Sequence, residues 1–503
     1  KEGITMSMSS SGRLENAHVP RSSSYLGPFG RMFSKLPPWI PPGKDDTAKN
    51  KNIEDFANTK MTTKAERPIN KNLPAGYTYF GQFIDHDITF DPTSSLQRQN
   101  DPNIIKNFRS PRLDLDSLYG EGPDDEPFMY DRDEEDEEGF TGYLLTGKGR
   151  VPQSHAATNE DDLPRNKQGR ALIGDMRNDE NVIISQLQLA FIKFHNRVMK
   201  ALDNSDDTKI KAMTSRERFQ HAQELVRWTY QYVVWNDYLD RLIDPKIHKS
   251  LLPVTPKKKT ARGMAHSFAG KYYKWEREPF IPVEFSVAAF RMGHSMVRSE
   301  YQVNESATFG RGKKIRIFPA HENDKSLKGF GFLRPEHTLQ WDWFVNLATS
   351  EFPIFPQLSQ KIDMQLSEAL FQIPSGKGKT NILAVLNIRR NWRMGVPGGT
   401  AIAEKMGIKP LKLDDPMEDC LWVYILKEAQ KKEKGKRLGP VGSRIVGEVL
   451  AGLLYGDPTS YIRNKPRWTP EPVAKLLNIK GPVNKTWELA DIIVFAGVNE
   501  KPF

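Results

Sequence analysis

The chain has one cysteine, Cys420, among 503 residues. A single cysteine cannot form an intramolecular disulfide, so the fold does not depend on an oxidising compartment. Zinc fingers and iron–sulfur clusters need several cysteine ligands, and both kinds of site are therefore excluded.

Long apolar runs are also missing. The longest, residues 445–455 and 491–498, are short and interrupted, whereas a membrane-spanning helix needs about 18 or more apolar residues. The sequence therefore predicts no transmembrane segment. Hydrophobic residues still make up 38% of the chain, which is enough for a large core and excludes wholesale disorder.

Positive charge exceeds negative charge but is not concentrated in one place. The formal net charge is +10, from 73 Lys and Arg against 63 Asp and Glu. Short basic runs at 257–259 and 431–437 are opposed by an acidic run at 131–138. Runs of this kind are usually solvated loops, so we expect no nucleic-acid partner, while anionic small substrates remain compatible with the charge.

The spacing of hydrophobic residues indicates a mainly α fold. Intervals of three and four predict helices at 180–202, 217–243, 282–297, 336–347, 357–371 and 442–455. Strand patterns are few and short, as at 314–318. We expect one large helical domain over residues 71–503, with long loops such as 120–165, after an irregular arm over residues 1–70.

Four polar segments stand out against this background. In the first, His86 lies between Asp85 and Asp87, and Gln82 stands one helical turn earlier on the same face. The residues alone leave open whether this histidine is a base, a metal ligand or part of a capped helix end.

The second segment places oxygen ligands at short spacing in a loop, on Ser110, Asp114 and Asp116. Hard oxygen ligands suit calcium, although the spacing is not that of an EF-hand. A turn with satisfied backbone donors is the alternative.

The last two segments each pair a cation with a group three residues away. Arg177 and Glu180 lie near a helix start, where a surface ion pair is the alternative to a functional role. Arg291 and His294 lie on a helix whose other residues are small or apolar, as if something large approached it closely. A histidine on such a face is otherwise a core residue.

Five motifs carry a resemblance to a known family. They are GQFIDHDITF from Gly81, RSPRLDLDSLYG from Arg109, GDMRNDEN from Gly174 with FHNR from Phe194, AAFRMGHSMVR from Ala288, and LNIRRNWRMGVPG from Leu386. In this order the chain resembles the animal-type haem peroxidases of the peroxidase–cyclooxygenase superfamily, from about residue 74 to about residue 470. It is most similar to the compact microbial members, which implies a single helical haem-peroxidase domain.

The resemblance implies roles on both sides of a haem b. On the proximal side, His294 is the implied iron ligand, Asn387 the acceptor for its other N–H, and Arg291 and Arg390 the partners of the haem propionates. On the distal side the implied roles are proton transfer by His86, charge stabilisation by Arg177 and the holding of water or halide by Gln82.

The same resemblance implies covalent links and a calcium ion. Asp85 and Glu180 match the carboxylates that form ester bonds to haem methyls in mammalian members. Asn181 stands where myeloperoxidase has the methionine of its sulfonium link, so that link is expected to be absent. Calcium is implied on Asp87 and on the loop ligands Ser110, the Arg112 carbonyl, Asp114 and Asp116.

The implied function is a haem peroxidase that reduces hydrogen peroxide and oxidises a halide, thiocyanate or phenolic donor through a ferryl haem intermediate. A haem-dependent fatty-acid dioxygenase of the same superfamily is the alternative, although Arg291 occupies the position of its radical tyrosine. A non-catalytic member is a further alternative, against which the complete distal set argues. We expect a secreted or extracytoplasmic location, although the sequence shows no charged-then-apolar leader.

Overall fold

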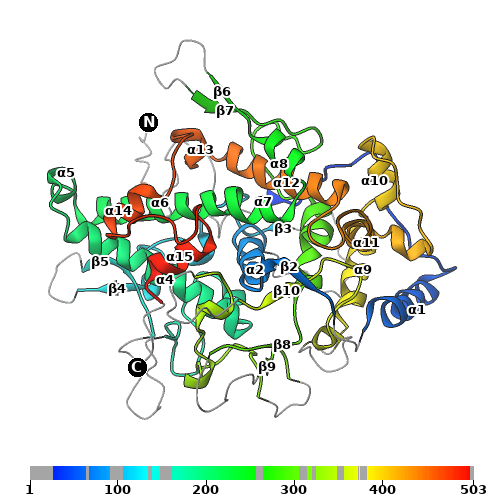
Figure 1. The fold of residues 1–503 in the computed structure, drawn as a ribbon, viewed down its shortest axis with the longest axis horizontal. Helices are drawn as coiled ribbons and strands as arrows, with labels where there is room; N and C mark the ends of the chain where they lie inside the picture. The colour runs from blue at the N-terminus through cyan, green and yellow to red at the C-terminus, as the bar shows by residue number, and fades with distance from the viewer. Residues whose placement is uncertain are drawn as a thin grey trace, which may run out of the picture.

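Helices predominate in the part of the chain that the structure describes (Figure 1). The computed structural model describes residues 27–63, 67–90, 106–133, 139–147, 161–256, 264–304, 314–319, 325–347, 356–371, 373 and 382–498. Most of the acidic run 131–138 and the basic run 257–259 lie outside these residues.

Fifteen α-helices occur within the described ranges. They are α1 (Asp46–Phe56), α2 (Gly76–Ile88), α3 (Asp116–Tyr119), α4 (Val182–Asp203), α5 (Thr208–Lys211), α6 (Ser215–Val233), α7 (Leu239–Leu242), α8 (Pro245–Leu251), α9 (Leu383–Arg393), α10 (Gly399–Lys405), α11 (Leu421–Glu433), α12 (Pro440–Gly456), α13 (Tyr461–Asn464), α14 (Glu471–Leu476) and α15 (Leu489–Ala496). None of these helices is long and apolar enough to cross a bilayer.

The strands of the described part are short and form antiparallel pairs rather than a larger sheet. The pairs are β1 (Gly27–Pro28) with β3 (Lys106–Asn107), β2 (Ile69–Pro74) with β10 (Leu358–Gln360), β4 (Tyr130–Arg132) with β5 (Phe140–Leu144), β6 (Val254–Pro256) with β7 (Met264–His266), and β8 (Glu300–Tyr301) with β9 (Ile315–Arg316). A mainly α fold with few short strands is therefore confirmed.

The helix α2 lies near the middle of the molecule (Figure 1). Aromatic side chains hold it in the core. Phe83 of α2 stacks on Phe191 of α4 with ring centroids 4.6 Å apart. Both rings meet the edge of Tyr230 from α6, at 6.1 and 5.8 Å. Such pairs contribute beyond the area that they bury. Packing on two long helices therefore fixes the position and rotation of α2, and with them the direction of His86.

The predicted helix at 282–297 is a composite of two helical types. A π-helical segment, η5 (Glu284–Ala288), runs into a 3-10 segment, η6 (Ala289–Met296). The two meet at Ala288, whose φ of −128° and ψ of −79° lie outside the α region. The buried Glu284 carboxylate accepts hydrogen bonds from the backbone N–H groups of Met32 and Phe33, at 3.1 and 3.0 Å. The N-terminal arm is thereby attached to the start of this composite helix.

Other helix predictions met with mixed outcomes. The periodic patterns at 180–202 and 442–455 correspond to α4 and α12, and the pattern at 217–243 corresponds to α6, a π-helical turn and α7. The arm over residues 1–70 is less irregular than expected, because it contains α1 and part of β2. Asp45 caps α1 by accepting from the Ala48 N–H at 2.8 Å.

Two predicted helices were wrong. Residues 336–347 contain 3-10 turns instead, and 357–371 begin with β10 and end with a 3-10 turn. The physical reason is a competing set of hydrogen bonds. The Gln357 side chain donates to the carbonyl oxygens of Gln302 and Trp343 at 2.7 and 3.2 Å, and β10 pairs with β2. The apolar residues here anchor a short strand and turns to the core, and their spacing imitates a helix.

Replacement of the arm's carboxylate anchor should destabilise the protein. In Glu284→Gln, the amide oxygen accepts only one of the two N–H groups, and the amide nitrogen faces the other donor. A buried, unsatisfied donor costs about 1–3 kcal/mol. We expect that loss in urea unfolding, together with faster proteolytic cleavage of the arm. Glu54→Gln, which removes a half-exposed ion pair with Arg389, is the control and should change stability little. Equal stability of the two variants would contradict the claim that Glu284 stabilises the protein by holding the N-terminal arm.

Candidate active site

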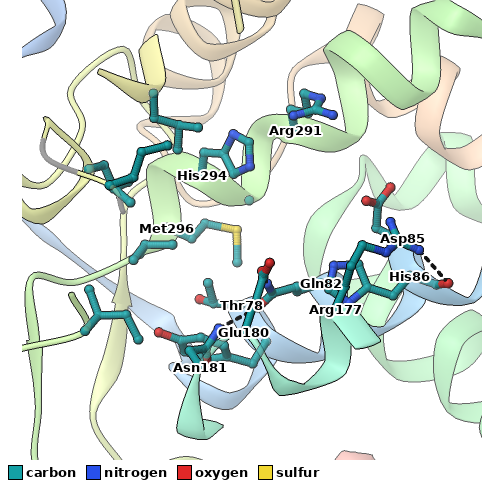
Figure 2. A pocket seen from close by; sticks show the side chains of 18 of the residues that line it. Thr78, Gln82, Asp85, His86, Arg177, Glu180, Asn181, Arg291, His294 and Met296 are labelled. Atoms are coloured by element: carbon teal, nitrogen blue, oxygen red, sulfur yellow. Dashed lines mark hydrogen bonds between the residues drawn. The ribbon is translucent and has the colours of Figure 1, made fainter. Parts of the chain in front are cut away.

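One cavity of about 420 Å³ lies between α2, the segment before α4 and η6. Figure 2 shows Arg291 and His294 on one side of it and residues of α2 and of the segment before α4 on the other. The predicted site residues among its lining are Gln82, Asp85, His86, Arg177, Glu180, Asn181, Arg291 and His294. Segments about 200 residues apart in the sequence are thereby brought to one place.

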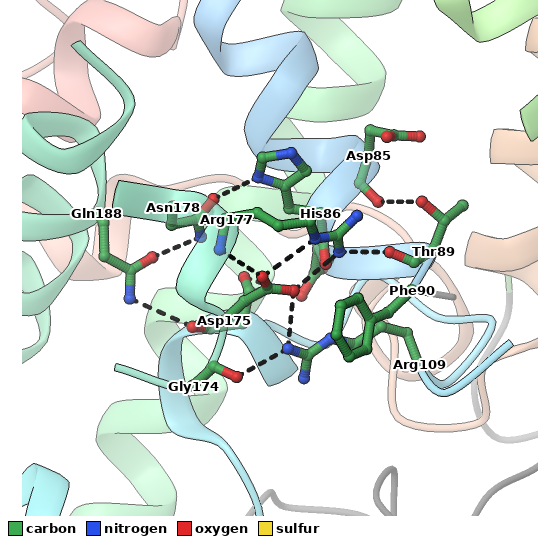
Figure 3. Close-up of polar contacts among 12 residues, drawn as sticks. Asp85, His86, Thr89, Phe90, Arg109, Gly174, Asp175, Arg177, Asn178 and Gln188 are labelled. Atoms are coloured by element: carbon green, nitrogen blue, oxygen red, sulfur yellow. Dashed lines mark hydrogen bonds and ion pairs between the residues drawn. The ribbon is translucent and has the colours of Figure 1, made fainter. Parts of the chain in front are cut away.

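The hydrogen bonds of His86 fix its tautomer. Its Nδ1 lies 2.7 Å from the Oδ1 of Asn178. Asn178 in turn donates from Nδ2 to the Oε1 of Gln188 at 2.8 Å, which fixes the direction of its amide (Figure 3). Because Asn178 Oδ1 can only accept, Nδ1 of His86 carries the proton and Nε2 keeps its lone pair. Burial, reinforced by the positive charge of Arg177, lowers the pKa of His86 to about 3. The imidazole is therefore neutral, and its Nε2 is unprotonated.

Arg177 is held by a buried carboxylate that the sequence analysis did not identify. Its Nε and Nη2 donate to Asp175 at 3.1 and 2.8 Å, and Nη2 also donates to the carbonyl oxygen of His86 at 3.1 Å (Figure 3). Although burial by itself raises the pKa of Asp175, the positive charges of Arg177 and Arg109 outweigh it and keep that pKa below its usual range. Arg177 therefore pairs with Asp175, and the surface ion pair between Arg177 and Glu180, which the sequence left as an alternative, does not form.

Glu180 and Gln82 are hydrogen-bonded to each other within the cavity. Burial raises the pKa of Glu180 to about 7, and burial also raises the pKa of Asp85. Asn181 is oriented toward two partners. Its Oδ1 accepts from Ile184 N at 3.0 Å and so caps α4, and its Nδ2 lies 3.5 Å from Gln82 Oε1. The two carboxyl groups predicted to form esters therefore both line the cavity, in surroundings that favour their neutral forms.

His294 contacts the predicted asparagine, but with the amide in the other direction. Its Nδ1 lies 2.8 Å from the nitrogen of Asn387, whose oxygen accepts from Arg291 Nη1 at 3.2 Å. The expected role of Asn387 as acceptor is thus not the arrangement seen. Burial and the charge of Arg291 lower the pKa of His294 to about 3, so the imidazole is neutral. Arg390 lies on α9 but is not among the residues that line the cavity.

The rest of the cavity wall is apolar and leaves open space beside His294. A Cβ placed on Gly293 would meet no heavy atom within 4 Å. Apolar side chains that line the wall include Phe290, Met296, Ile317, Leu370 and Leu383. The cavity can accommodate a flat apolar group with charged substituents between two neutral histidines.

The predicted calcium ligands gather beside α2 but do not converge. Asp87 accepts from Leu115 N at 3.2 Å, and Ser110 donates to Asp114 at 2.8 Å. Burial raises the pKa of Asp87, and the negative charges of Asp114 and Asp116 raise it further. Within the described ranges, however, no three Asp, Glu, His or Cys side chains are placed to hold one metal ion. The donor chemistry suits calcium, and a binding geometry is not formed.

Three functional partners were missed in the sequence: Asp175, Asn178 and Gln188. The first two stand inside the quoted motif around Arg177 but carry no spacing signal of their own. Gln188 did carry one, because it stands four residues after Ile184 and three before Phe191, among the apolar positions that predicted α4. His195 of the FHNR motif is buried, with its Nδ1 3.0 Å from the Tyr119 hydroxyl and its Nε2 2.9 Å from the Gly142 carbonyl oxygen.

Comparisons with known proteins find relatives of the chain among peroxidases. A family profile described as "Animal haem peroxidase" matches residues 102–422. The chorion peroxidase of Drosophila melanogaster is 25% identical over 57% of this chain and 34% of its own length. The peroxidase-like protein of Margaritifera margaritifera is 24% identical over 90% and 64%. The chain therefore spans between about a third and two thirds of these relatives' lengths.

Solved structures share the fold at low sequence identity. Peroxidase A from Dictyostelium discoideum superposes with a TM-score of 0.63 at 17% identity, covering 97% of this chain and 96% of that chain. A fatty acid α-dioxygenase from Arabidopsis thaliana gives 0.56 at 18% identity, covering 94% and 77%. The profile match covers more than half of the sequence and includes the motifs that supply Arg177 and His294. The chain belongs to the animal haem peroxidase family.

Proposed function

We propose that this protein is a haem peroxidase that reduces hydrogen peroxide with electrons from a small donor. The observation that carries the proposal is His86, a buried imidazole whose Nδ1 proton is held by Asn178 and whose Nε2 is unprotonated and able to accept a proton. It lines the same cavity as His294. Peroxidases among the relatives of the chain support the same assignment.

A haem b suits the cavity by the chemistry of its lining. His294 is neutral, as a nitrogen ligand of haem iron must be, and the Arg291 guanidinium offers donors that match a propionate. The apolar wall and the space beside Gly293 suit the macrocycle. When bound, haem would supply the redox-active iron at which the O–O bond of the peroxide is reduced.

The distal residues would move one proton within the peroxide. Nε2 of His86 takes the proton from one oxygen and returns it to the other, which leaves as water. The positive charge of Arg177 stabilises the oxygen on which negative charge develops. Because Asp175 and the His86 carbonyl hold Arg177, its charge is already in place and costs no rearrangement during the reaction.

The proximal residues would have to exchange one hydrogen bond. Iron binding through Nε2 of His294 requires the imidazole proton on Nδ1, and an acceptor for that proton. We propose that the Asn387 amide turns through half a turn when haem binds, so that its oxygen accepts from Nδ1. Arg291 then loses its acceptor on Asn387 and becomes available to a propionate.

A fatty-acid dioxygenase is the second candidate, because enzymes of that kind share the fold. The family's radical tyrosine would stand three residues before His294, where this chain has Arg291, hydrogen-bonded to Asn387 and to the Ser286 carbonyl. Oxygen uptake with a saturated fatty acid as the substrate distinguishes the two functions, and we expect none.

Loss of the distal residues should slow the reaction with peroxide. His86→Ala and Arg177→Ala should each lower the bimolecular rate constant by on the order of 10²-fold or more. Stopped-flow absorption of the haem-loaded protein, mixed with hydrogen peroxide and then with a donor, measures the rate. His221→Ala, outside the cavity, is the control. A wild-type rate in both distal variants would remove these residues from the mechanism.

We further propose that Asp85 and Glu180 form esters to haem methyl groups during turnover. Each carboxylate oxygen bonds to a methyl carbon that loses one hydrogen, and hydrogen peroxide takes up the two electrons and becomes two waters. The reacting form is the carboxylate. Because the pKa of Glu180 is raised to about 7 by burial, its ester should form faster at pH 8 than at pH 6.

Acid–butanone extraction after peroxide treatment at the two pH values measures this linkage, and peptide masses locate it. Glu180→Gln should abolish the link at 180 and retain the one at Asp85. Asn181 has no sulfur, so its peptide should gain no mass of its own. Haem that extracts completely at both pH values would show that the esters do not form.

We also propose that calcium binds beside α2 through Asp87, Ser110, the Arg112 carbonyl, Asp114 and Asp116. Support comes from the burial of the three aspartates: Asp87 directly follows His86 in the chain, and the charges of Asp114 and Asp116 act on it. A ligand at 100 times its Kd stabilises a protein by about 2.7 kcal/mol, so chelation should lower Tm by several degrees and slow the reaction with peroxide. Asp116→Ala should abolish the response, and the exposed Asp206→Asn should retain it. Absence of calcium by elemental analysis, with unchanged Tm after chelation, would refute the site.

A further inference from the structure

The rim of the cavity consists of two side chains from one segment. Among the described residues that line the cavity, Lys328 and Phe330 alone are exposed, and Phe330 exposes 48% of its surface. The other lining residues are buried or half-buried. A molecule that enters the cavity past these residues therefore meets an ammonium group and an aromatic face.

Backbone hydrogen bonds hold this segment against the residues before α4. Val182 N donates to the Leu327 carbonyl at 2.8 Å, Gly329 N to the Glu180 carbonyl at 3.1 Å, and Phe330 N to the Asp179 carbonyl at 2.7 Å. The Lys328–Phe330 rim is thus attached to the same short segment that supplies Glu180 and Asn181 to the cavity.

Gly329 of this segment lies very close to the backbone of Asp179, and the side chain of Asp179 is itself held in place. A Cβ on Gly329 would lie 1.8 Å from the Asp179 carbonyl oxygen, so only glycine allows this approach. The Asp179 carboxylate in turn accepts two hydrogen bonds from the Arg165 guanidinium, at 2.6 and 2.8 Å. The rim therefore has a fixed position relative to the reactive groups.

Phe330 has a backbone conformation that its side chain disfavours. Its φ is +61°, in the left-handed region that bulky residues rarely occupy. Despite this strain the ring is half exposed at the mouth of the cavity rather than buried in the core. Strained residues of this kind are concentrated at ligand-binding sites, and an exposed ring beside a cavity is a ready surface for an aromatic ligand.

The charge around the rim is positive. Lys328 forms no ion pair with any residue that the structure describes. It also lines a second cavity of about 260 Å³, on whose wall Arg334 is exposed. Further inside the first cavity lie the guanidinium groups of Arg177 and Arg291, together with the carboxyl groups of Asp85 and Glu180, whose pKa values burial raises toward the neutral form. An anion is therefore attracted toward the rim, and a cation is repelled.

We propose that Lys328 and Phe330 bind the reducing donor, and that this donor is a phenol with a carboxylate group. The ring stacks on Phe330, the carboxylate pairs with Lys328, and the phenolic hydroxyl points into the cavity. The inference rests on the proposed function and names its donor class. Two phenols each give up one electron and one proton, and one hydrogen peroxide becomes two waters. Two phenoxyl radicals leave.

The test is calorimetric titration of the resting haem-loaded protein, without peroxide, with 3-(4-hydroxyphenyl)propionate and its uncharged amide. Lys328→Gln should weaken binding of the acid about tenfold and leave binding of the amide unchanged. Phe330→Gly should weaken both, since glycine adopts the same φ without strain and removes only the ring. Lys314→Gln, an exposed lysine outside the cavity lining, makes the same change of charge and should bind as the wild type does.

Equal binding of the acid by the wild type and Lys328→Gln would overturn the proposal. So would a change in the Soret band of Lys328→Gln with unaltered acid binding, because Lys328 would then hold the haem rather than the donor. Preferential binding of a saturated fatty acid over the phenol would also overturn it. The wild-type reaction with peroxide is measured separately. If that reaction is absent while the charge-dependent binding persists, the proposed peroxidase function is wrong. The proposal that Lys328 and Phe330 form a binding site is then still supported.

Discussion

The distal side of the cavity depends on one buried carboxylate. Asp175 accepts hydrogen bonds from both Arg109 and Arg177. Breaking a buried ion pair by removing one partner is strongly unfavourable, because a charge is left behind without compensation. The three groups therefore form a unit. Through it, the loop with the predicted calcium ligands, the segment before α4 and the carbonyl of His86 are held in one arrangement.

Burial also decides the protonation of the reactive groups. The loss of water penalises the charged form of any titratable group. The pKa of His86 and of His294 therefore falls, while the pKa of Glu180 rises. Arginine keeps its charge under the same conditions. The cavity thus combines neutral imidazoles with permanent cations, which is the combination that proton transfer to and from a peroxide needs.

The two histidines differ in what holds them. His86 faces an acceptor whose direction is fixed by Gln188, so its tautomer is locked. His294 faces an amide whose other end is shared with Arg291. The tautomer of His86 is thus fixed by the protein alone. The proximal group has an arrangement that a bound haem would have to change, because the same amide serves two partners.

Local sequence patterns predicted the long helices well and the short elements poorly. In α4 and α12 the apolar residues recur at helical intervals because these are long helices buried over most of their length. Residues 357–371 show similar spacing, yet their backbone pairs with β2. Periodicity records which residues are buried, and it does not record which distant strand competes for their hydrogen bonds. The π and 3-10 character of the helix with His294 left no pattern either.

The sequence by itself identified His86, Arg177 and His294 as candidate site residues, because each stands in a motif that resembles the family; their types and spacing alone left their roles open. Only the tertiary structure decided their partners: Asp175 rather than Glu180 for Arg177, and the amide nitrogen of Asn387 for His294. It also decided that Lys328 and Phe330 form the exposed rim. The reason is that hydrogen bonds and exposure depend on distances of a few ångströms between segments far apart in the chain, and these distances are set by packing.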